Sequence, residues 1–534
     1  MSTPASQEPG DDRTVVAGGP GDDGPDRDAR RLAALAGVVS ALVTLTTAHL
    51  VAALLDPGAS PLGAVGDAFI DLTPRWLKDA AIAAFGVNDK SALLVGMVVV
   101  VAVLAAATGV LAHRAPHAGT GAVLALGGVS AIAATSRGDA TSLAAVPSLV
   151  GAAVGAVCLA VLVRRLGRTD AVDAPPVAAD RRSFLQLAAG LSAVAVLAAV
   201  AGSVAGSVRR TAASARDLLT LPRPARAAPA VPAGAQAPVA GVADVVTANH
   251  DFYRIDTAFV VPQVDPETWT LRVHGLVERE VTMTFAELLD ADLVEAFVTL
   301  TCVSNPIGGD LAGNARWLGL PVREVLAMAG PLAGADMVLS RSADGFTAST
   351  PLPVLTDDRD AMLAVGMNGE PLPLEHGFPV RMVVPGLYGY VSATKWLVDL
   401  EVTRFADQQA YWTQRGWSEL GPVKTASRIE VPRAGARLAA GDVAVGGTAW
   451  AQHTGVTAVE VQVDDGPWEP VLLADEISVD TWRQWSWQWQ ATPGEHTLRV
   501  RATDAADGTQ TGERAGVLPD GATGWHEVAV TVTG

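Results

Sequence analysis

The alternation of hydrophobic and polar positions divides the chain into an apolar first part and a mixed second part. Before residue 210, apolar residues gather in runs of about 20, the length that a helix needs to cross a bilayer. These runs predict a membrane domain over 31–210 with five helices, at 32–54, 91–112, 118–136, 143–163 and 184–206. Residues 1–30 lack apolar periodicity and predict a disordered tail. The charged segment 62–87 predicts an interfacial loop with an amphipathic helix.

The pattern changes after residue 210. Residues 211–240 are rich in alanine and proline, which is typical of a semi-rigid tether. From 241 to 419, short alternating stretches such as Trp269–Gly275 predict strands, and short helix signals lie between them. Two helices are indicated by their first residues, one at 285–289 after a capping box of Thr284 and Glu287, the other at 322–329 after Pro321. We therefore expect an α+β domain here.

The last part of the chain, 420–534, predicts strands only. Val459–Val463 and Trp468–Leu473 flank a turn and indicate a hairpin, and His496–Arg501 and Trp525–Val532 indicate further strands. Many short strands with turn signals favour an immunoglobulin-like sandwich. One strand carries alternating tryptophans, Trp485, Trp487 and Trp489. We interpret this stripe as sandwich core, with a subunit interface as the alternative.

Basic residues at the ends of the apolar runs predict the orientation in the membrane. They fall on one side if the N-terminus is cytoplasmic, as positively charged loops do. The residues on that side are Arg30, Arg31, His113, Arg114, Arg164, Arg165, Arg168, Arg181 and Arg182. Five crossings of the cell membrane then place everything after residue 210 on the extracytoplasmic side.

The segment around Arg181 and Arg182 is open to two interpretations. Asp180–Gln186, followed by a mildly apolar run, resembles a twin-arginine motif, an address for the export of folded proteins. The alternative is an ordinary pair of arginines on the cytoplasmic side of a membrane helix. Both interpretations predict the same topology.

The net charge and the two cysteines limit the partners and the cysteine chemistry that the chain can have. The net charge of −18 argues against a nucleic-acid partner, because phosphate binding needs a basic face. Of the two cysteines, Cys158 lies in a predicted membrane helix, so no disulfide with Cys302 is expected. Cys302 follows a strand-like run and precedes a glycine-rich loop, which suits a nucleophile or a soft-metal ligand. The alternative is a small buried hydrophobic residue.

Six short motifs follow one another in the second half of the chain. They are Asn249–Arg254, Thr301–Cys302, Gly313–Trp317, Met367–Pro373, His376–Arg381 and Pro385–Trp396. Together and in this order they resemble the sulfite oxidase superfamily of molybdenum-cofactor enzymes, and the resemblance covers almost all of 245–534. The stretch after Lys424 resembles the dimerisation domain of that superfamily, which implies a homodimer.

The resemblance implies a molybdenum–molybdopterin cofactor and residues that contact it. The Cys302 thiolate would bind the metal, because a polarisable anionic sulfur is a good ligand for it. His376, Arg381 and Lys395 match positions that hold the pterin and its phosphate, where charged donors are needed. The other cofactor-contacting positions are Asn249, His250, Phe252, Tyr253, Asn314, Arg316 and Ser392.

Several of these assignments have a structural alternative. For His376 and Arg381 it is a surface pair in a turn before a strand, and for Asn314 and Arg316 it is a purely structural role. No residue stands out as a general acid or base. Tyr388 and Tyr253 are the residues expected to donate a hydrogen bond in catalysis, and packing is the alternative for both.

The chain departs from sulfite oxidases where the substrate binds. Those enzymes carry paired arginines shortly after the metal-binding cysteine, and the corresponding places here lie near Pro306 and Ile307. A tyrosine expected near the cofactor corresponds to Trp417. A site without these cations should discriminate poorly for sulfite. We therefore expect oxygen-atom transfer on a small-molecule or protein-bound S- or N-oxide, with sulfite oxidation as the alternative.

The histidines in and near the apolar runs bear on the electron partner. His49 lies near the outer end of the first predicted helix, whereas His113 and His117 lie at the inner end of the second, so they cannot share one haem iron. We therefore predict no haem within this chain and expect a separate quinone or cytochrome partner. A non-enzymatic membrane receptor is the alternative of another class.

Overall fold

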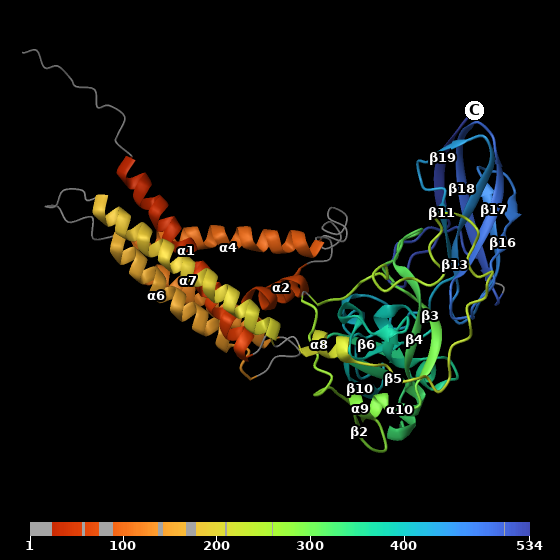
Figure 1. Cartoon of the computed structure of the whole chain (residues 1–534), viewed down its shortest axis with the longest axis horizontal. Coiled ribbons are helices and arrows are strands. Elements are labelled where there is room, and N and C mark those ends of the chain that lie inside the picture. Colours follow the sequence, from red (N-terminus) through yellow and green to blue (C-terminus); the bar gives the residue numbers. More distant parts are fainter. Residues whose placement is uncertain are drawn as a thin grey trace, which may run out of the picture. The chain divides into compact units, whose positions relative to one another are not determined.

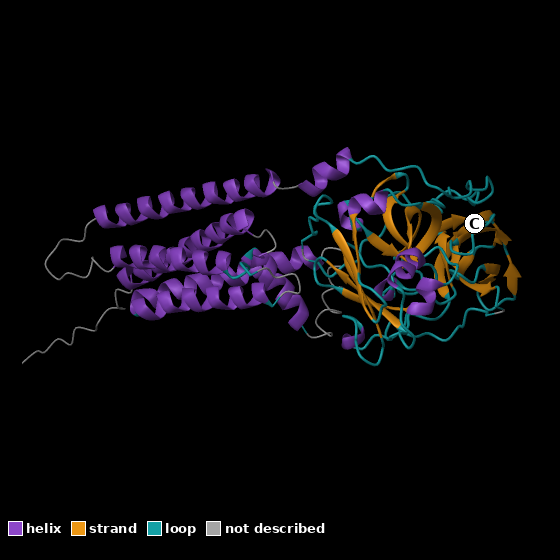
Figure 2. Cartoon of the chain, turned by 90° about the horizontal axis from the view of Figure 1, so that it is seen from below, coloured by secondary structure: helices purple, strands orange, loops and turns teal. Residues whose placement is uncertain are grey.

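The computed structural model describes residues 24–55, 59–73, 89–136, 142–166, 178–208, 211–258, 260–506 and 508–534. The chain forms two compact units, 1–135 with 141–206, and 136–140 with 207–534. The described part of the first unit is helical, and the second is rich in strands (Figure 1, Figure 2).

The helices of the first unit confirm the five predicted apolar helices. The described residues of this unit form six helices: α1 (Gly24–Leu55), α2 (Pro61–Leu72), α4 (Asp89–Arg114), α5 (Pro116–Thr135), α6 (Val146–Leu166) and α7 (Ala178–Val208). Five contain a stretch long and apolar enough to cross a membrane, at Asp28–Leu55, Ala92–Arg114, Pro116–Thr135, Val146–Leu166 and Arg182–Ser203. Helix α1 begins inside the predicted tail, whose residues 1–23 lie outside the described residues, as does Arg168. Helix α2 occupies the start of the predicted interfacial segment, of which 74–87 is not described.

Glycines allow α1 to pack closely against its neighbours. A Cβ atom on Gly37 would lie 1.9 Å from the Ala105 carbonyl oxygen of α4. The Ser40 hydroxyl of α1 donates a hydrogen bond of 2.6 Å to the Gly155 carbonyl of α6. Small residues and interhelical hydrogen bonds are the usual means of association for helices in lipid. The composition of these helices therefore suits a bilayer and also specifies how they pack.

Residues 211–240 differ from the predicted tether, because they are attached to the second unit. They begin with α8 (Thr211–Leu218), whose Arg216 side chain donates to the carbonyls of Pro371 and Leu372 at 3.1 and 2.9 Å. Further along, the backbone N–H of Ala237 donates to Gln484 at 2.7 Å. An alanine- and proline-rich composition predicts little secondary structure, but it does not prevent hydrogen bonds to neighbouring domains.

The α+β domain contains two sheets, with strand orders β2-β1-β10-β5-β6 and β3-β4-β7-β8, and β9 also pairs with β7. The strands are β1 (Thr270–Gly275), β2 (Val281–Thr284), β3 (Val294–Thr301), β4 (Ala312–Pro321), β5 (Met337–Ser342), β6 (Thr347–Pro351), β7 (Met362–Met367), β8 (Glu370–Pro371), β9 (Arg381–Val383) and β10 (Leu397–Thr403). The helices are α9 (Phe285–Leu289), α10 (Val322–Ala329), α11 (Leu352–Thr356), η4 (Leu374–His376), η5 (Gly389–Val391) and η6 (Thr413–Arg415). The capping box of α9 and the bounds of α9 and α10 confirm the predictions.

The C-terminal part is a sandwich of two sheets, ordered β11-β13-β17-β16 and β12-β19-β18-β14-β15. Its strands are β11 (Ala426–Val431), β12 (Arg437–Ala439), β13 (Gly441–Trp450), β14 (Val456–Val463), β15 (Trp468–Pro470), β16 (Leu472–Leu473), β17 (Arg483–Ala491), β18 (Gly494–Asp504) and β19 (His526–Thr533). Trp485 and Trp489 are buried in the core that both sheets share, and Trp487 packs against it. The prediction that this stripe forms core is confirmed.

Candidate active site

Cys302 lies at the end of a buried strand and lines a cavity in the α+β domain. Strand β3 is buried along nearly its whole length, and the backbone N–H of Cys302 donates to the Leu311 carbonyl at 2.9 Å. A turn follows, because the Asn305 N–H donates to the Cys302 carbonyl at 3.0 Å. The cavity contains about 870 Å³ of empty space, its mouth and the open solvent there included.

A cluster of cationic and imidazole side chains lines the same cavity. His376 ends η4, Arg381 begins β9 and Lys395 precedes β10, and all three are almost fully buried. Gly377 allows these residues to lie close together. Its φ of +110° ends the 3₁₀ turn, and a Cβ there would lie 3.0 Å from the Cβ atoms of both Arg381 and Lys395. A residue with a side chain is therefore poorly tolerated at this position.

The partners of the cluster determine its charges. Arg381 donates to the backbone carbonyls of His376 and Ala393 at 3.1 and 3.4 Å, and burial lowers its pKa to about 10. Burial also lowers the pKa of Lys395 to about 8, although Asp256 binds the ammonium at 2.7 Å. Burial and then Arg381 lower the pKa of His376 to about 4, so this imidazole is neutral near pH 7. The cavity therefore presents two buried cations.

The loop before the α+β domain supplies a further wall of the cavity. Phe252 packs on Gly313, where a Cβ would lie 2.8 Å from the ring, and edge-on against His376 at 5.6 Å. Burial and then the charge of Cys302 raise the pKa of Tyr253, so its hydroxyl keeps its proton. Asn249 orients the histidine through its backbone carbonyl, which lies 3.1 Å from His376 Nε2. Asn249 and the exposed His250 line a different, more open cavity.

Besides Asn249 and His250, four further residues predicted to belong to the site do not line the cavity of Cys302. The buried Ser392 hydroxyl donates to the Tyr388 carbonyl at 2.9 Å. Tyr388 lines a second cavity together with Pro306 and Ile307, and its hydroxyl accepts from the Lys424 N–H at 3.4 Å. Arg316 lies 3.7 Å from Glu295 on the partly exposed side of β4. Asn314 is fully buried among backbone groups.

Asn314 has the structural role that the sequence left open. Its amide nitrogen donates to the Val245 carbonyl at 2.7 Å and its amide oxygen accepts from Thr299 at 3.2 Å. Replacement by alanine would remove both hydrogen bonds and leave the buried Thr299 hydroxyl without its acceptor, at a cost of about 1–3 kcal/mol. The Val245 carbonyl would still accept from the Trp482 indole at 2.9 Å. We expect Asn314→Ala to lower the free energy of unfolding by this amount in urea titrations. Arg316→Ala, at a partly exposed position, should change it by less than about 0.5 kcal/mol.

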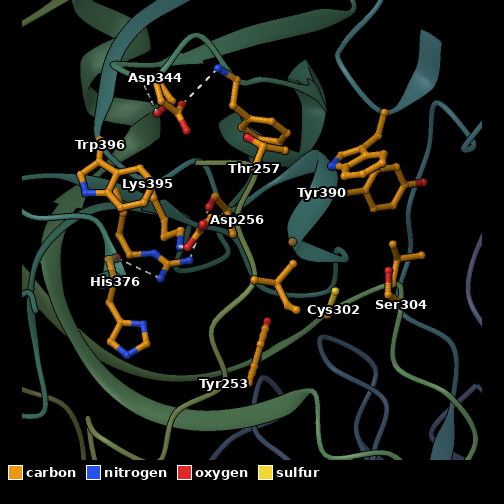
Figure 3. Close-up of a pocket in the computed structure, with 18 of the residues that line it drawn as sticks. Tyr253, Asp256, Thr257, Cys302, Ser304, Asp344, His376, Tyr390, Lys395 and Trp396 are labelled. Atoms are coloured by element: carbon orange, nitrogen blue, oxygen red, sulfur yellow. Dashed lines mark hydrogen bonds and ion pairs between the residues drawn. The ribbon is translucent and has the colours of Figure 1, made fainter. Parts of the chain in front are cut away.

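Several residues of the cavity were not predicted. Asp256 binds both Lys395 and Arg254, and Asp344, whose pKa burial raises, lines the same cavity as Asp256 and Lys395 (Figure 3). Ser304 lies beside Cys302 in Figure 3, and its hydrogen bonds to the sulfur oppose the rise in thiol pKa that burial causes. Of these three residues, only Asp256 could have been anticipated from the sequence, because a lysine that is expected to be buried requires an acidic counterion.

The geometry and the comparisons with known proteins define a class. A model of the oxidoreductase molybdopterin binding domain matches residues 258–412. Human mitochondrial sulfite oxidase is 29% identical over 330 residues, which are 51% of this chain and 59% of that protein. The uncharacterized oxidoreductase YuiH of Bacillus subtilis is 32% identical over 160 residues, 29% of this chain and 76% of that protein. Among solved structures, the sulfane dehydrogenase SoxCD of Paracoccus pantotrophus covers 50% of this chain and 74% of its own, at 22% identity and a TM-score of 0.45.

The class is that of molybdopterin-binding oxidoreductases. Within it, this chain belongs to the sulfite oxidase family, and its cofactor is molybdenum–molybdopterin. Membership of this family favours the enzymatic interpretation over the receptor alternative. The chain spans only 59% of the length of human sulfite oxidase.

The residues of the cavity fit this cofactor. Arg381 is a buried cation whose hydrogen-bond partners are backbone carbonyls, so an anionic group in the cavity would meet an uncompensated charge. Lys395 adds a second cation, and a phosphate is the kind of anion that such donors bind. Cys302 supplies a sulfur ligand on the wall of the same cavity.

Proposed function

We propose that this chain is a membrane-anchored oxidoreductase that transfers an oxygen atom from a neutral S- or N-oxide. The observation that carries the proposal is the single cavity lined by Cys302 and by the buried cations Arg381 and Lys395. We assign the metal to Cys302 and the phosphate to the two cations. The neutral His376 would hydrogen-bond the pterin, held in place by the Asn249 carbonyl.

The cofactor supplies a two-electron couple, and the protein binds, orients and shields the substrate. For a sulfoxide, the S–O bond breaks, two electrons and two protons are taken up, and the oxygen leaves as water. We propose a quinol or a reduced cytochrome as the source of the electrons. Tyr253, protonated and at the cavity wall, is placed to donate a hydrogen bond to a bound oxide.

The substrate assignment is supported by the absence of cations from the places where sulfite oxidases carry paired arginines. Pro306 and Ile307 occupy these places, and they line the cavity that contains Tyr388. Sulfite oxidation is the second candidate, because sulfite oxidases are among the relatives. Metal and pterin analysis of the purified full chain tests the cofactor. A panel of methionine sulfoxide, trimethylamine N-oxide and sulfite with artificial electron carriers tests the substrate, and activity on sulfite alone would contradict the proposal.

The proposed location is the cell membrane, with five crossings and the second unit on the extracytoplasmic side. It is supported by basic residues at one set of helix ends: Arg114 and Arg165 near the ends of α4 and α6, and Arg31 and Arg182 near the starts of α1 and α7. We also assign the sandwich to the immunoglobulin-like class and propose that it forms a homodimer. Protease digestion of spheroplasts tests the location, since the second unit should be cut from outside.

Lys395 should make cofactor retention depend on pH. Its pKa of about 8 means that it loses its proton above pH 8, and a neutral amine no longer attracts a phosphate. In the cofactor-free protein, the same lowered pKa makes stability change with pH in the opposite direction. The free energy of unfolding rises between pH 8 and the pKa of the unfolded lysine, near 10.5, because the unfolded state binds more protons in this range. We expect pterin release to increase several-fold from pH 7 to 9.

Lys395→Arg serves as the control, because a guanidinium does not titrate in this range. Its pterin release, followed by fluorescence after gel filtration, should stay nearly constant from pH 7 to 9. An equal increase in both proteins would show that Lys395 is not the group responsible.

A further inference from the structure

The cavity of Cys302 has two chemically different ends. In Figure 3, His376, Lys395 and Trp396 lie on one side, and Tyr390 and Ser304 lie on the other, with Cys302 next to Ser304. Arg381 belongs to the first side because it donates to the His376 carbonyl at 3.1 Å. Every cation that lines the cavity, within the described part of the chain, is therefore on that side.

The other end is formed by aromatic rings. Tyr390 lies 5.8 Å from Trp417, and Trp417 lies 6.2 Å from Trp412, measured between ring centroids. All three rings line the cavity. Tyr390 belongs to η5, which precedes β10 in the chain. Trp412 and Trp417 flank η6, which follows β10. We call Tyr390, Trp412 and Trp417 the aromatic end.

The rings of the aromatic end are held in place. The Tyr390 hydroxyl donates to the Ser418 carbonyl at 2.8 Å, so its polar atom is directed to the backbone. A Cβ on Gly421 would lie 2.8 Å from Cε1 of the Tyr390 ring, which shows how closely the backbone packs there. Trp412 and Trp417 pack against the domain core. A preorganised apolar wall binds an apolar group at little entropic cost.

We propose that the aromatic end binds the apolar substituent of an organic sulfoxide, so that the S–O group is directed toward Cys302. This inference rests on the proposed function and specifies its substrate as a sulfoxide with an aryl or extended thioether group. Such groups gain from burial against aromatic rings. A small anion such as sulfite gains nothing there, because the cations lie on the opposite side of the cavity.

The test compares substrates that differ only in the apolar group. In the full-length enzyme, Trp417→Ala should lower kcat/KM for methyl phenyl sulfoxide by about 10-fold or more, as for the loss of apolar contacts in a pocket. Its kcat/KM for dimethyl sulfoxide, which lacks the large apolar group, should fall far less. Trp468→Ala, a partly buried tryptophan of the sandwich outside this cavity, is the matched control and should change neither constant.

A binding measurement separates the inference from the reaction. Methyl phenyl sulfone resembles the sulfoxide but is not a substrate of the proposed reduction, and its Kd can be titrated by tryptophan fluorescence. We expect this Kd to rise by the same factor in Trp417→Ala. Trp417→Leu, which keeps an apolar side chain, should give a smaller rise and serves if the alanine variant does not fold.

The outcomes distinguish the two proposals. An unchanged Kd for the sulfone in both variants, with molybdenum bound and sulfoxides reduced, overturns the aromatic end and leaves the proposed function standing. An equal fall of kcat/KM for both sulfoxides also overturns it. Absence of molybdopterin from the wild-type protein overturns the proposed function, whatever the sulfone titration shows.

Discussion

Replacing Cys302 with serine is expected to reduce turnover by more than about 100-fold without unfolding the domain. Loss of groups that merely support a metal ligand typically costs 10–100-fold, and the proposed ligand itself should cost more. Serine is close to cysteine in size, and it fits a position that is 9% exposed. Turnover of a sulfoxide with an artificial electron donor measures the loss, and X-ray absorption at the molybdenum edge should show one sulfur fewer around the metal.

Cys158→Ser provides the matched control. Cys158 is the other cysteine of the chain and is buried in α6 of the first unit. Its replacement should leave both the turnover and the sulfur count at the metal unchanged. Full activity of Cys302→Ser, or an unchanged metal spectrum, would remove Cys302 from the metal site.

The apolar helices and the sandwich strands could be predicted because their patterns are local. Runs of about 20 apolar residues predict helices whatever lies next to them, and alternating tryptophans predict one buried face of a strand. The attachment of 211–240 could not be predicted. Arg216 binds backbone carbonyls at 371 and 372, and a carbonyl acceptor has no signature in the sequence.

The candidate site was predictable in its cations and less so in its surroundings. His376, Arg381 and Lys395 were found through the motifs that contain them, and the structure brings them together around Gly377. Asn314 lies in one of the motifs, yet its side-chain amide hydrogen-bonds to the Val245 carbonyl and the Thr299 hydroxyl. Whether a polar side chain faces a cavity or a neighbouring strand depends on tertiary packing, which a motif does not record.

Asp256→Asn is expected to lower the free energy of unfolding of the cofactor-free protein by about 3–5 kcal/mol, the usual cost of removing one partner of a buried ion pair. Asp256 and Lys395 lie 2.7 Å apart with side chains 3% and 9% exposed, so the lysine cannot replace its counterion with water. Asp520→Asn is the matched control, because Asp520 and Lys424 lie 2.8 Å apart with side chains 46% and 30% exposed. Its cost should be at most about 1 kcal/mol. Urea titrations of both variants measure the difference.

Adding the cofactor should reduce the cost of Asp256→Asn and leave that of Asp520→Asn unchanged. A phosphate near Lys395 would act as the counterion that Asp256 no longer provides, and its binding stabilises the folded state alone. The same protein should therefore lose less stability from the substitution when the pterin is bound. Equal losses with and without the cofactor would mean that the phosphate does not lie near Lys395, and the assignment of this side chain to the cofactor would be wrong.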